Sequence, residues 1–288
     1  METFLLTALT GVSFGSILFL VASGLSLIFG VMGVLNLAHG ALYMVGAYIG
    51  WTIAIQQEGN FVLAVLAGGV GTVIVGLVLD RGFLRRIHGM LNQQVLLTFG
   101  FVYVLTNLCL WYWKALPKAP FTAPALDWSF PIAGVTYSFA RMAITAAGIA
   151  LAIFLWWLQS KTRFGTIVRA GMTDKEMTEG LGINYGIVAT IVFALGCFLA
   201  GIAGVLGAQL FGAHLELGMN VLVLAVVVVV VGGMGSVPGA LVGGLLIGLV
   251  VSFGKVLVPG LSMFLVYLVM IVILMIRPTG ILGKAITS

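Results

Sequence analysis

The stretch GVMGVLNLAHGALYMVGAYIG, residues 30–50, decides the fold class of this chain. It is an apolar run with a small polar cluster, Asn36 and His39, near its start. Lipid cannot hydrogen-bond a loosened backbone or an imidazole, so the segment is expected to face protein or a water-filled path. An ionisable side chain inside such a run marks a functional site by default. The glycines that loosen the helix around the cluster are Gly30, Gly33 and Gly40.

The composition places the rest of the chain in a membrane as well. Its 288 residues are 61% hydrophobic and 7% charged, with a mean hydropathy of +1.23. A soluble domain carries roughly 25% charged residues, so this chain lacks the charge to cover a surface facing water. The apolar runs are about 17 to 25 residues long, which suits transmembrane helices. They lack the short alternating segments of an outer-membrane barrel.

We expect an all-α, polytopic fold with about nine apolar passages and some broken helices. The passage at 219–231 is short, so eight crossings with one re-entrant segment is the alternative. The chain is expected to form a single domain over 1–288. The nine passages are 4–29, 36–55, 61–79, 95–113, 140–158, 187–211, 219–231, 237–253 and 261–276.

Basic residues are concentrated in three regions outside these passages. The positive-inside rule places such loops in the cytoplasm, and nine crossings put all three on one side. The N-terminus and the loop at 114–139 are then outside, and the C-terminus is cytoplasmic. This accounts for the net charge of +5 more simply than nucleic-acid binding does. The regions contain Arg81, Arg85 and Arg86, then Lys161, Arg163, Arg169 and Lys175, and finally Arg277 and Lys284.

Glycine and other small residues recur at four-residue spacing, which places them on one helix face. We interpret this spacing as close helix packing, with a hinge or a thin-walled pore as the alternative. Two glycine-rich segments, 31–34 and 233–239, are expected near the cytoplasmic side and form at most a weak internal repeat. The spaced residues are Ala200, Gly204 and Ala208, and Gly235, Gly239 and Gly243.

The loop at 159–185, QSKTRFGTIVRAGMTDKEMTEGLGINY, is the longest polar segment on the basic side. Thr173 or Asp174 is placed to cap a short helix from residue 175 to 181, and Thr173 with Glu176 fits a capping box. Gly182 follows where the end of a helix favours positive φ. The helix would be amphipathic and would lie against the membrane or a partner; an ordinary solvated loop is the alternative.

Glu176, followed six residues later by Gly182, resembles the E-A-A-x-x-x-G signature of ABC importer permeases. Met177 and Thr178 stand where that signature has two alanines. Other segments resemble the same family in the same order along nearly the whole chain. Together they resemble the LivH-type permeases of branched-chain amino acid ABC importers. The segments are GLSLIFGVMGVLNLAHGALYMVGAY, RAGMTDKEMTEGLGIN, GGMGSVPGALVGGLLIG and RPTGILG.

The resemblance implies a subunit that forms half of a translocation path in the bacterial inner membrane. It implies three kinds of companion: a second homologous permease or a second copy of this chain, two ATPase subunits and a periplasmic solute-binding protein. It also implies that the loop at 159–185 contains a coupling helix, which docks into the ATPase. The residues that match this ATPase contact are Arg169, Asp174, Glu176, Gly182 and Asn184.

Few polar residues occur within the predicted passages, and none of them is a carboxylate. A path without fixed charge suits a neutral or zwitterionic solute and disfavours an ion-coupled carrier. His39 either bonds a neighbouring carbonyl and holds two helices together, or it lines the path. The candidate path residues are Asn36, His39, Tyr43, Thr98 and Gln209.

The chain has no G-x-x-x-x-G-K-[ST] loop, so we expect ATP and Mg²⁺ on the partner subunits and no cofactor on this chain. No catalytic triad or metal-ligand spacing occurs, and we expect a transport subunit, not an enzyme. Branched-chain or related hydrophobic amino acids are the expected solutes, with urea, short amides or small organic acids as alternatives within the family. A self-sufficient secondary carrier and a non-transporting scaffold are alternatives from other classes.

Overall fold

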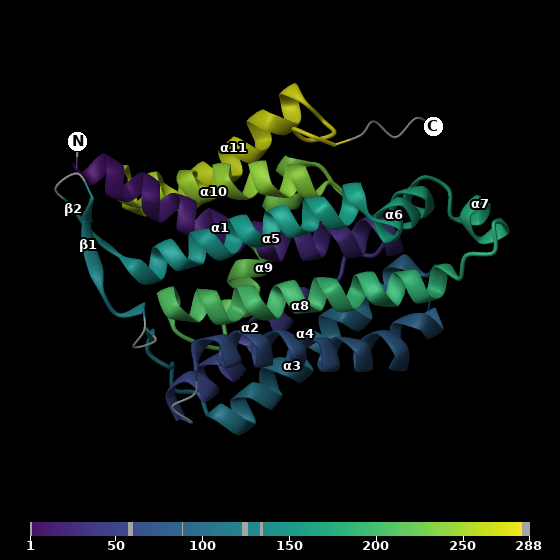
Figure 1. The fold of residues 1–288 in the computed structure, drawn as a ribbon, viewed down its shortest axis with the longest axis horizontal. Helices are drawn as coiled ribbons and strands as arrows, with labels where there is room; N and C mark the ends of the chain where they lie inside the picture. The colour runs from purple at the N-terminus through teal and green to yellow at the C-terminus, as the bar shows by residue number, and fades with distance from the viewer. Residues whose placement is uncertain (1, 57–59, 88, 123–125, 133–134, 284–288) are drawn as a thin grey trace.

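The structure is a computed structural model that describes residues 2–56, 60–87, 89–122, 126–132 and 135–283. Helices dominate it, and one two-stranded hairpin interrupts them (Figure 1). The helices are α1 (Glu2–Met32), α2 (Ala38–Trp51), α3 (Phe61–Gly82), α4 (Leu91–Trp113), α5 (Phe139–Lys161), α6 (Arg163–Thr173), α7 (Lys175–Gly180), α8 (Tyr185–Phe211), α9 (Leu217–Gly232), α10 (Val237–Leu257) and α11 (Ser262–Ile276). The shorter elements are a π-helix (Thr52–Gln56), two 3₁₀ turns (Leu84–Ile87 and Pro259–Leu261) and the strands β1 (Ser129–Ile132) and β2 (Val135–Ser138).

Eight helical segments in the described part are long and apolar enough to cross a membrane, and α9 is a shorter apolar helix of 16 residues. The long helices run side by side along the longest axis of the molecule (Figure 1). α9 packs against α1, α2 and α10 at the centre of the bundle. The all-α, polytopic prediction is confirmed. The short passage predicted at 219–231 is helical, and the helix begins two residues earlier than expected.

The core of the bundle is formed by α1, α2, α8 and α9, whereas α4 and α11 lie outside it and expose most of their apolar side chains. Glycines allow the inner helices to approach closely, as expected where lipid gives no hydrophobic driving force between helices. A Cβ built on Gly15 of α1 would lie 2.8 Å from the carbonyl oxygen of Gly244 on α10. Gly204, Gly239 and Gly243 likewise face backbone atoms of neighbouring helices, so their interpretation as packing residues is confirmed.

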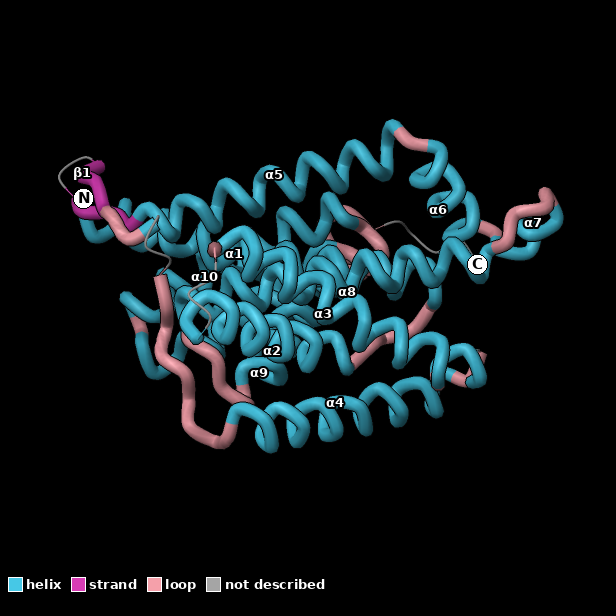
Figure 2. Tube along the Cα trace, turned by 60° about the horizontal axis from the view of Figure 1, so that its bottom comes forward, coloured by secondary structure: helices cyan, strands magenta, loops and turns pink. Residues whose placement is uncertain are grey.

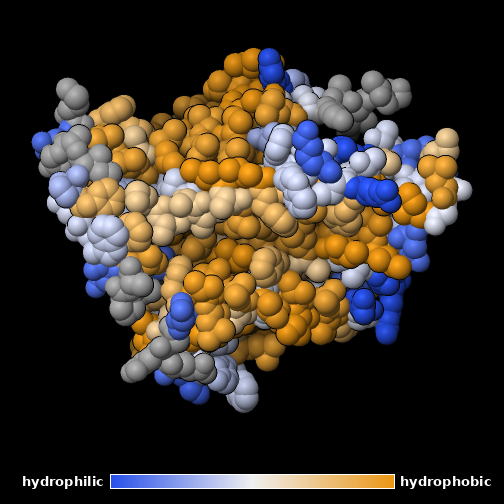
Figure 3. Space-filling view, viewed as in Figure 1, coloured by the Kyte–Doolittle hydropathy of each residue, from blue (hydrophilic) through white to orange (hydrophobic). Residues whose placement is uncertain are grey.

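The two ends of the bundle differ in composition. Hydrophobic side chains cover the middle of the face in Figure 3, and hydrophilic ones gather at its left and right ends. The hairpin of β1 and β2 lies at the left end in Figure 1, where α1 begins. α6 and α7 lie at the opposite end.

The three basic regions gather at the end that carries α6 and α7. Arg85 donates a hydrogen bond to the carbonyl of Gly186, at the start of α8. The segment after Arg277 pairs with the end of α9 through hydrogen bonds from Ile281 and Leu282. The clustering predicted from the charges is thereby confirmed for the described residues, and Lys284 lies outside them.

Candidate functional site

The chain turns back into the bundle between α1 and α2 without forming a helix. Gly33, with a φ of +67°, ends α1, and α2 begins only at Ala38. The imidazole of His39 lies 3.1 Å from the carbonyl oxygen of Val21, eleven residues before the end of α1. At 1.5 Å per residue, α2 therefore begins about 16 Å inside the end of α1. We call residues 33–37 the central break.

The polar side chains in and next to this break are buried, although Gly33 at its start is exposed. Asn36 and His39 have no exposed surface. The Asn36 side chain accepts a hydrogen bond from the backbone N–H of Ala38, and the Asn36 carbonyl accepts one from His39. Irregular backbone at this depth is tolerated only where protein buries it or water fills a cavity. The burial of Asn36 and His39 agrees with the expectation that this segment faces protein or a water-filled path.

His39 holds α2 against α1. The Val21 carbonyl can only accept, so Nε2 carries the proton and Nδ1 is an acceptor. A Cβ added to Gly24 would lie 3.0 Å from the imidazole ring, which places the ring directly on the backbone of α1. This geometry agrees with the helix-holding interpretation of His39. A role in lining the path stays a prediction.

The first turns of α2 and α9 pack against each other. A Cβ on Gly40 would clash with the backbone of Gly218 and would lie 2.6 Å from Cβ of Leu222. Tyr43 packs against Gly204 and Gly207 of α8. α2 is therefore wedged between α1, α8 and α9, and two shortened helices meet in the middle of the bundle.

Several buried polar groups near this junction have no hydrogen-bond partner among the described residues. Leaving such a group unpaired costs roughly 1–3 kcal/mol, which is why each instance calls for an explanation. They include four of the five predicted path residues: three at the start of α2, and Gln209 near the end of α8. The atoms are Ser26 Oγ, Asn36 Nδ2, His39 Nδ1, Tyr43 Oη, Tyr48 Oη, and Nε2 and Oε1 of Gln209.

The structure groups some of the predicted path residues and separates others. Asn36, His39 and Tyr43 belong to one buried junction. Thr98 is buried in α4 and donates to the carbonyl of Val95 in its own helix. No hydrogen bond among the described residues links Thr98 to the central break.

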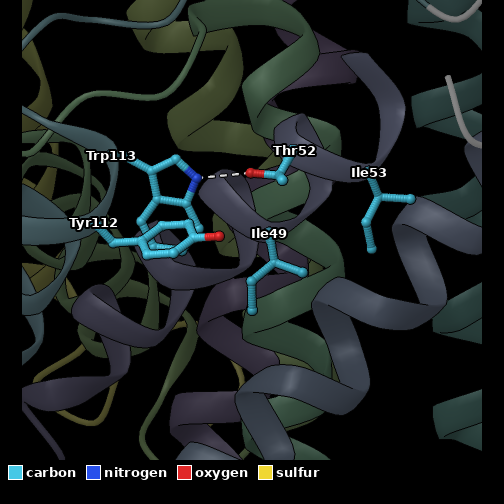
Figure 4. A pocket seen from close by; sticks show the side chains of 5 residues that line it. All are labelled: Ile49, Thr52, Ile53, Tyr112 and Trp113. Atoms are coloured by element: carbon cyan, nitrogen blue, oxygen red, sulfur yellow. Dashed lines mark hydrogen bonds between the residues drawn. The ribbon is translucent and has the colours of Figure 1, made fainter. Parts of the chain in front are cut away.

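A shallow pocket of about 250 Å³ lies at the other end of α2 (Figure 4). Trp113 donates a hydrogen bond of 2.7 Å to the hydroxyl of Thr52, where α2 changes into a π-helix. The remaining wall is mostly apolar, with Tyr112 as its other hydroxyl group. The sequence gave no sign of this pocket. Its lining residues are Ile49, Thr52, Ile53, Tyr112 and Trp113.

The predicted coupling segment consists of two short helices that project from the bundle (Figures 1 and 2). α6 was not predicted: we expected polar loop before a single short helix. Asp174 is the cap of α7, and its side chain accepts from the N–H of Met177 at 2.9 Å. The Thr173 hydroxyl instead bonds the carbonyl of Arg169 in α6, so the Thr173 cap was wrong. Gly182 has a φ of +82°, as predicted.

Exposed apolar side chains lie on α7 and directly after it. Met177 is 67% exposed and Leu181 is 74% exposed. Glu176 is also exposed, and Asn184 caps α8 by accepting from the N–H of Ile187. The predicted coupling residues therefore flank a short helix, and they do not form a catalytic cluster.

A buried carboxylate lies beside this segment, and the sequence did not reveal it. Asp80 at the end of α3 is 1% exposed, and it accepts from the hydroxyl of Thr190 at 3.2 Å. Arg85 lies 3.6 Å from the carboxylate and also contacts Thr190. These groups tie α3 to the first turns of α8, directly after the coupling segment. No group of His, Cys, Asp or Glu able to hold a metal ion occurs among the described residues.

These features define a class: a helical membrane protein with a broken helix at its buried centre and two short helices that project at one end. Residues 7–274 match the family described as the permease component of branched-chain amino acid transport systems. The chain belongs to that family. It is therefore the permease subunit of an ABC importer, a multi-pass protein of the inner membrane and a transport component, not an enzyme.

The chain is also similar to individual relatives along nearly their whole length. The chain is 31% identical to the high-affinity branched-chain amino acid permease protein LivH of Escherichia coli K12, covering 98% of this chain and 96% of that protein. It is 30% identical to the corresponding protein BraD of Pseudomonas aeruginosa, covering 95% and 94%. A solved structure, PsaBC from Streptococcus pneumoniae in complex with Fab, has the same fold, with a TM-score of 0.51 at 11% identity over 95% of this chain and 90% of that chain.

Proposed function

We propose that this chain forms half of the path for branched-chain or related hydrophobic amino acids in an ATP-driven importer. The whole of 1–288 acts as one permease domain. Its companions are a second homologous permease or a second copy of this chain, two ATPase subunits that carry ATP and Mg²⁺, and a periplasmic solute-binding protein. The observation that carries the proposal is the full-length similarity to permeases named for branched-chain amino acids.

The end that carries α6 and α7 faces the cytoplasm in this proposal. The described residues of the three basic regions gather there, which follows the positive-inside rule. The start of α1 and the hairpin then face the periplasm, where a solute-binding protein docks. The exposed face of α7, with Arg169, Asp174, Glu176, Gly182 and Asn184 around it, contacts the ATPase.

Uptake by the reconstituted complex tests the solute. The complex of this chain with its companions is placed in vesicles, and accumulation of radiolabelled leucine, isoleucine and valine is measured with and without ATP. We expect ATP-dependent accumulation of at least one of the three. Uptake of urea, a short amide or a small organic acid in their place would reassign the solute, and accumulation by this chain alone under an ion gradient would contradict the proposal.

His39→Ala tests the path assignment at His39; the other proposed path residues are Asn36, Tyr43, Thr98 and Gln209. We expect lower thermal stability, because the bond to Val21 is lost, together with reduced uptake per assembled complex. Counting assembled complexes separates the two effects. Unchanged uptake per complex would leave His39 with the helix-holding role alone.

A further inference from the structure

Tyr185, the first residue of α8, joins the coupling segment to the end of α1. Its hydroxyl donates a buried hydrogen bond of 3.1 Å to the carbonyl of Val31. Val31 lies two residues before Gly33, where the central break begins. Tyr185 is only 3% exposed, although Leu181, four residues before it, is 74% exposed.

The ring of Tyr185 contacts both helices of the coupling segment. It packs on Gly171 of α6, where an added Cβ would lie 2.6 Å from Cζ and 2.8 Å from Cδ2 of the ring. The ammonium group of Lys175, at the start of α7, lies 5.8 Å from the ring centroid. One side chain therefore contacts α6, α7 and α1.

Met172 provides a second contact between the same segments. Its sulfur would lie 3.3 Å from a Cβ on Gly30, and its methyl carbon would lie 3.1 Å from a Cβ on Gly235. Gly30 belongs to the end of α1, and Gly235 to the turn before α10. α6 is thus packed against both glycine-rich segments that precede α2 and α10.

Two unpacked glycines flank this contact. Gly33 and Gly182 both have positive φ, and a Cβ on either would meet no atom within 4 Å. The backbone at Gly33 and Gly182 can move without breaking side-chain packing. The packed contact between them, made by Tyr185 and Met172, transmits displacement. Energetic coupling between distant sites is carried by contiguous contacts of this kind.

We infer that Tyr185 is a positioning residue that links movement of the coupling segment to the central break. The inference depends on the proposed function, in which the coupling segment contacts the ATPase. A shift of α7 pulls the Tyr185 ring, the ring moves Val31 through its hydroxyl, and Val31 moves the chain that enters the break. Tyr185 touches no solute in this scheme.

Tyr185→Phe in the reconstituted complex tests the inference. The ring stays on Gly171, and only the bond to Val31 is lost. We expect uptake per ATP hydrolysed to fall about fivefold, because the net free energy of a typical buried hydrogen bond corresponds to a factor of about that size. Basal ATP hydrolysis and the amount of assembled complex stay unchanged. Tyr267→Phe, which removes a hydroxyl from a 40% exposed position on α11, is the matched control and keeps the wild-type ratio.

Gly171→Ala is the second variant, because its Cβ displaces the ring while the hydroxyl remains. It is expected to lower the same ratio. A wild-type ratio in Tyr185→Phe would overturn the inference, and so would loss of assembly in that variant, which would assign the hydroxyl to folding. Docking is followed separately by cross-linking from Met177→Cys to the ATPase, since both native cysteines are buried. If no cross-link forms in the otherwise native complex, the proposed docking of α7 on the ATPase is wrong, regardless of the uptake measured for Tyr185→Phe.

Discussion

The central break and the coupling segment share a backbone feature but are held in place by different interactions. In each, a glycine of positive φ lies just after a helix: Gly33 follows α1, and Gly182 follows α7. Packing fixes the break, where Asn36 and His39 are fully buried. Local capping fixes α7 and leaves its apolar face exposed. Changes in the break should therefore reduce the stability of this chain, whereas changes in α7 should reduce binding of a partner.

The largest effect on partner binding is expected from Met177→Asp combined with Leu181→Asp. Both side chains are mostly exposed, so the melting temperature should stay within about 1 °C, as for ordinary surface changes. Binding to the ATPase should weaken at least tenfold, because two carboxylates would enter an apolar contact. Co-purification of the complex measures the binding.

Leu116→Asp is the control for that double variant. Leu116 is 73% exposed at the opposite end of the bundle, so it should leave ATPase binding unchanged. Normal ATPase binding by the double variant would place the docking surface away from α7.

Gly40→Ala tests the other half of the comparison. The added methyl group would enter the contact between α2 and α9, against Gly218 and Leu222. Overpacking of this kind costs about 1–3 kcal/mol, which corresponds to a fall in melting temperature of about 5 °C. Thermal unfolding of the purified chain in detergent measures the effect.

Gly100→Ala is the matched control, because this α4 glycine is exposed and an added Cβ meets nothing within 4 Å. It should unfold at the wild-type temperature or slightly above, since alanine favours the helix. Equal melting temperatures for Gly40→Ala and Gly100→Ala would mean that the centre of the bundle is less tightly packed than the geometry indicates.

The elements that sequence predicted well are those set by local physics. Apolar runs determine which segments cross the membrane as helices. The cap at Asp174 and the turn at Gly182 follow from short-range rules. The polar cluster at Asn36 and His39 was recognised because lipid cannot satisfy such groups. In each case the information lies within a few residues of the feature itself.

The features that sequence missed depend on contacts between distant segments. Nothing around Asp80 indicates that its partner is Thr190, more than a hundred residues later. The pocket near Thr52 forms only because α2 and α4 end side by side. The sequence predicted a loop where α6 forms, because glycine and threonine interrupt the hydrophobic pattern of α6. The packing of α6 against α5 and α8 cannot be inferred from its own residues.

The smallest effect is expected from removing the cap of α7. Asp174→Ala deletes the acceptor for the Met177 N–H, which costs about 1 kcal/mol of local helix stability. The bulk of the chain does not depend on α7, so the melting temperature should not change, and ATPase binding should weaken about fivefold because α7 must order itself on docking. Asp174→Asn keeps a side-chain oxygen in the capping position and should bind nearly as well as the wild type. Equal weakening in both variants would show that the charge of Asp174 contributes to partner binding and that its capping bond does not. The distinction between an α7 fixed by local capping and a central break fixed by packing would then need revision.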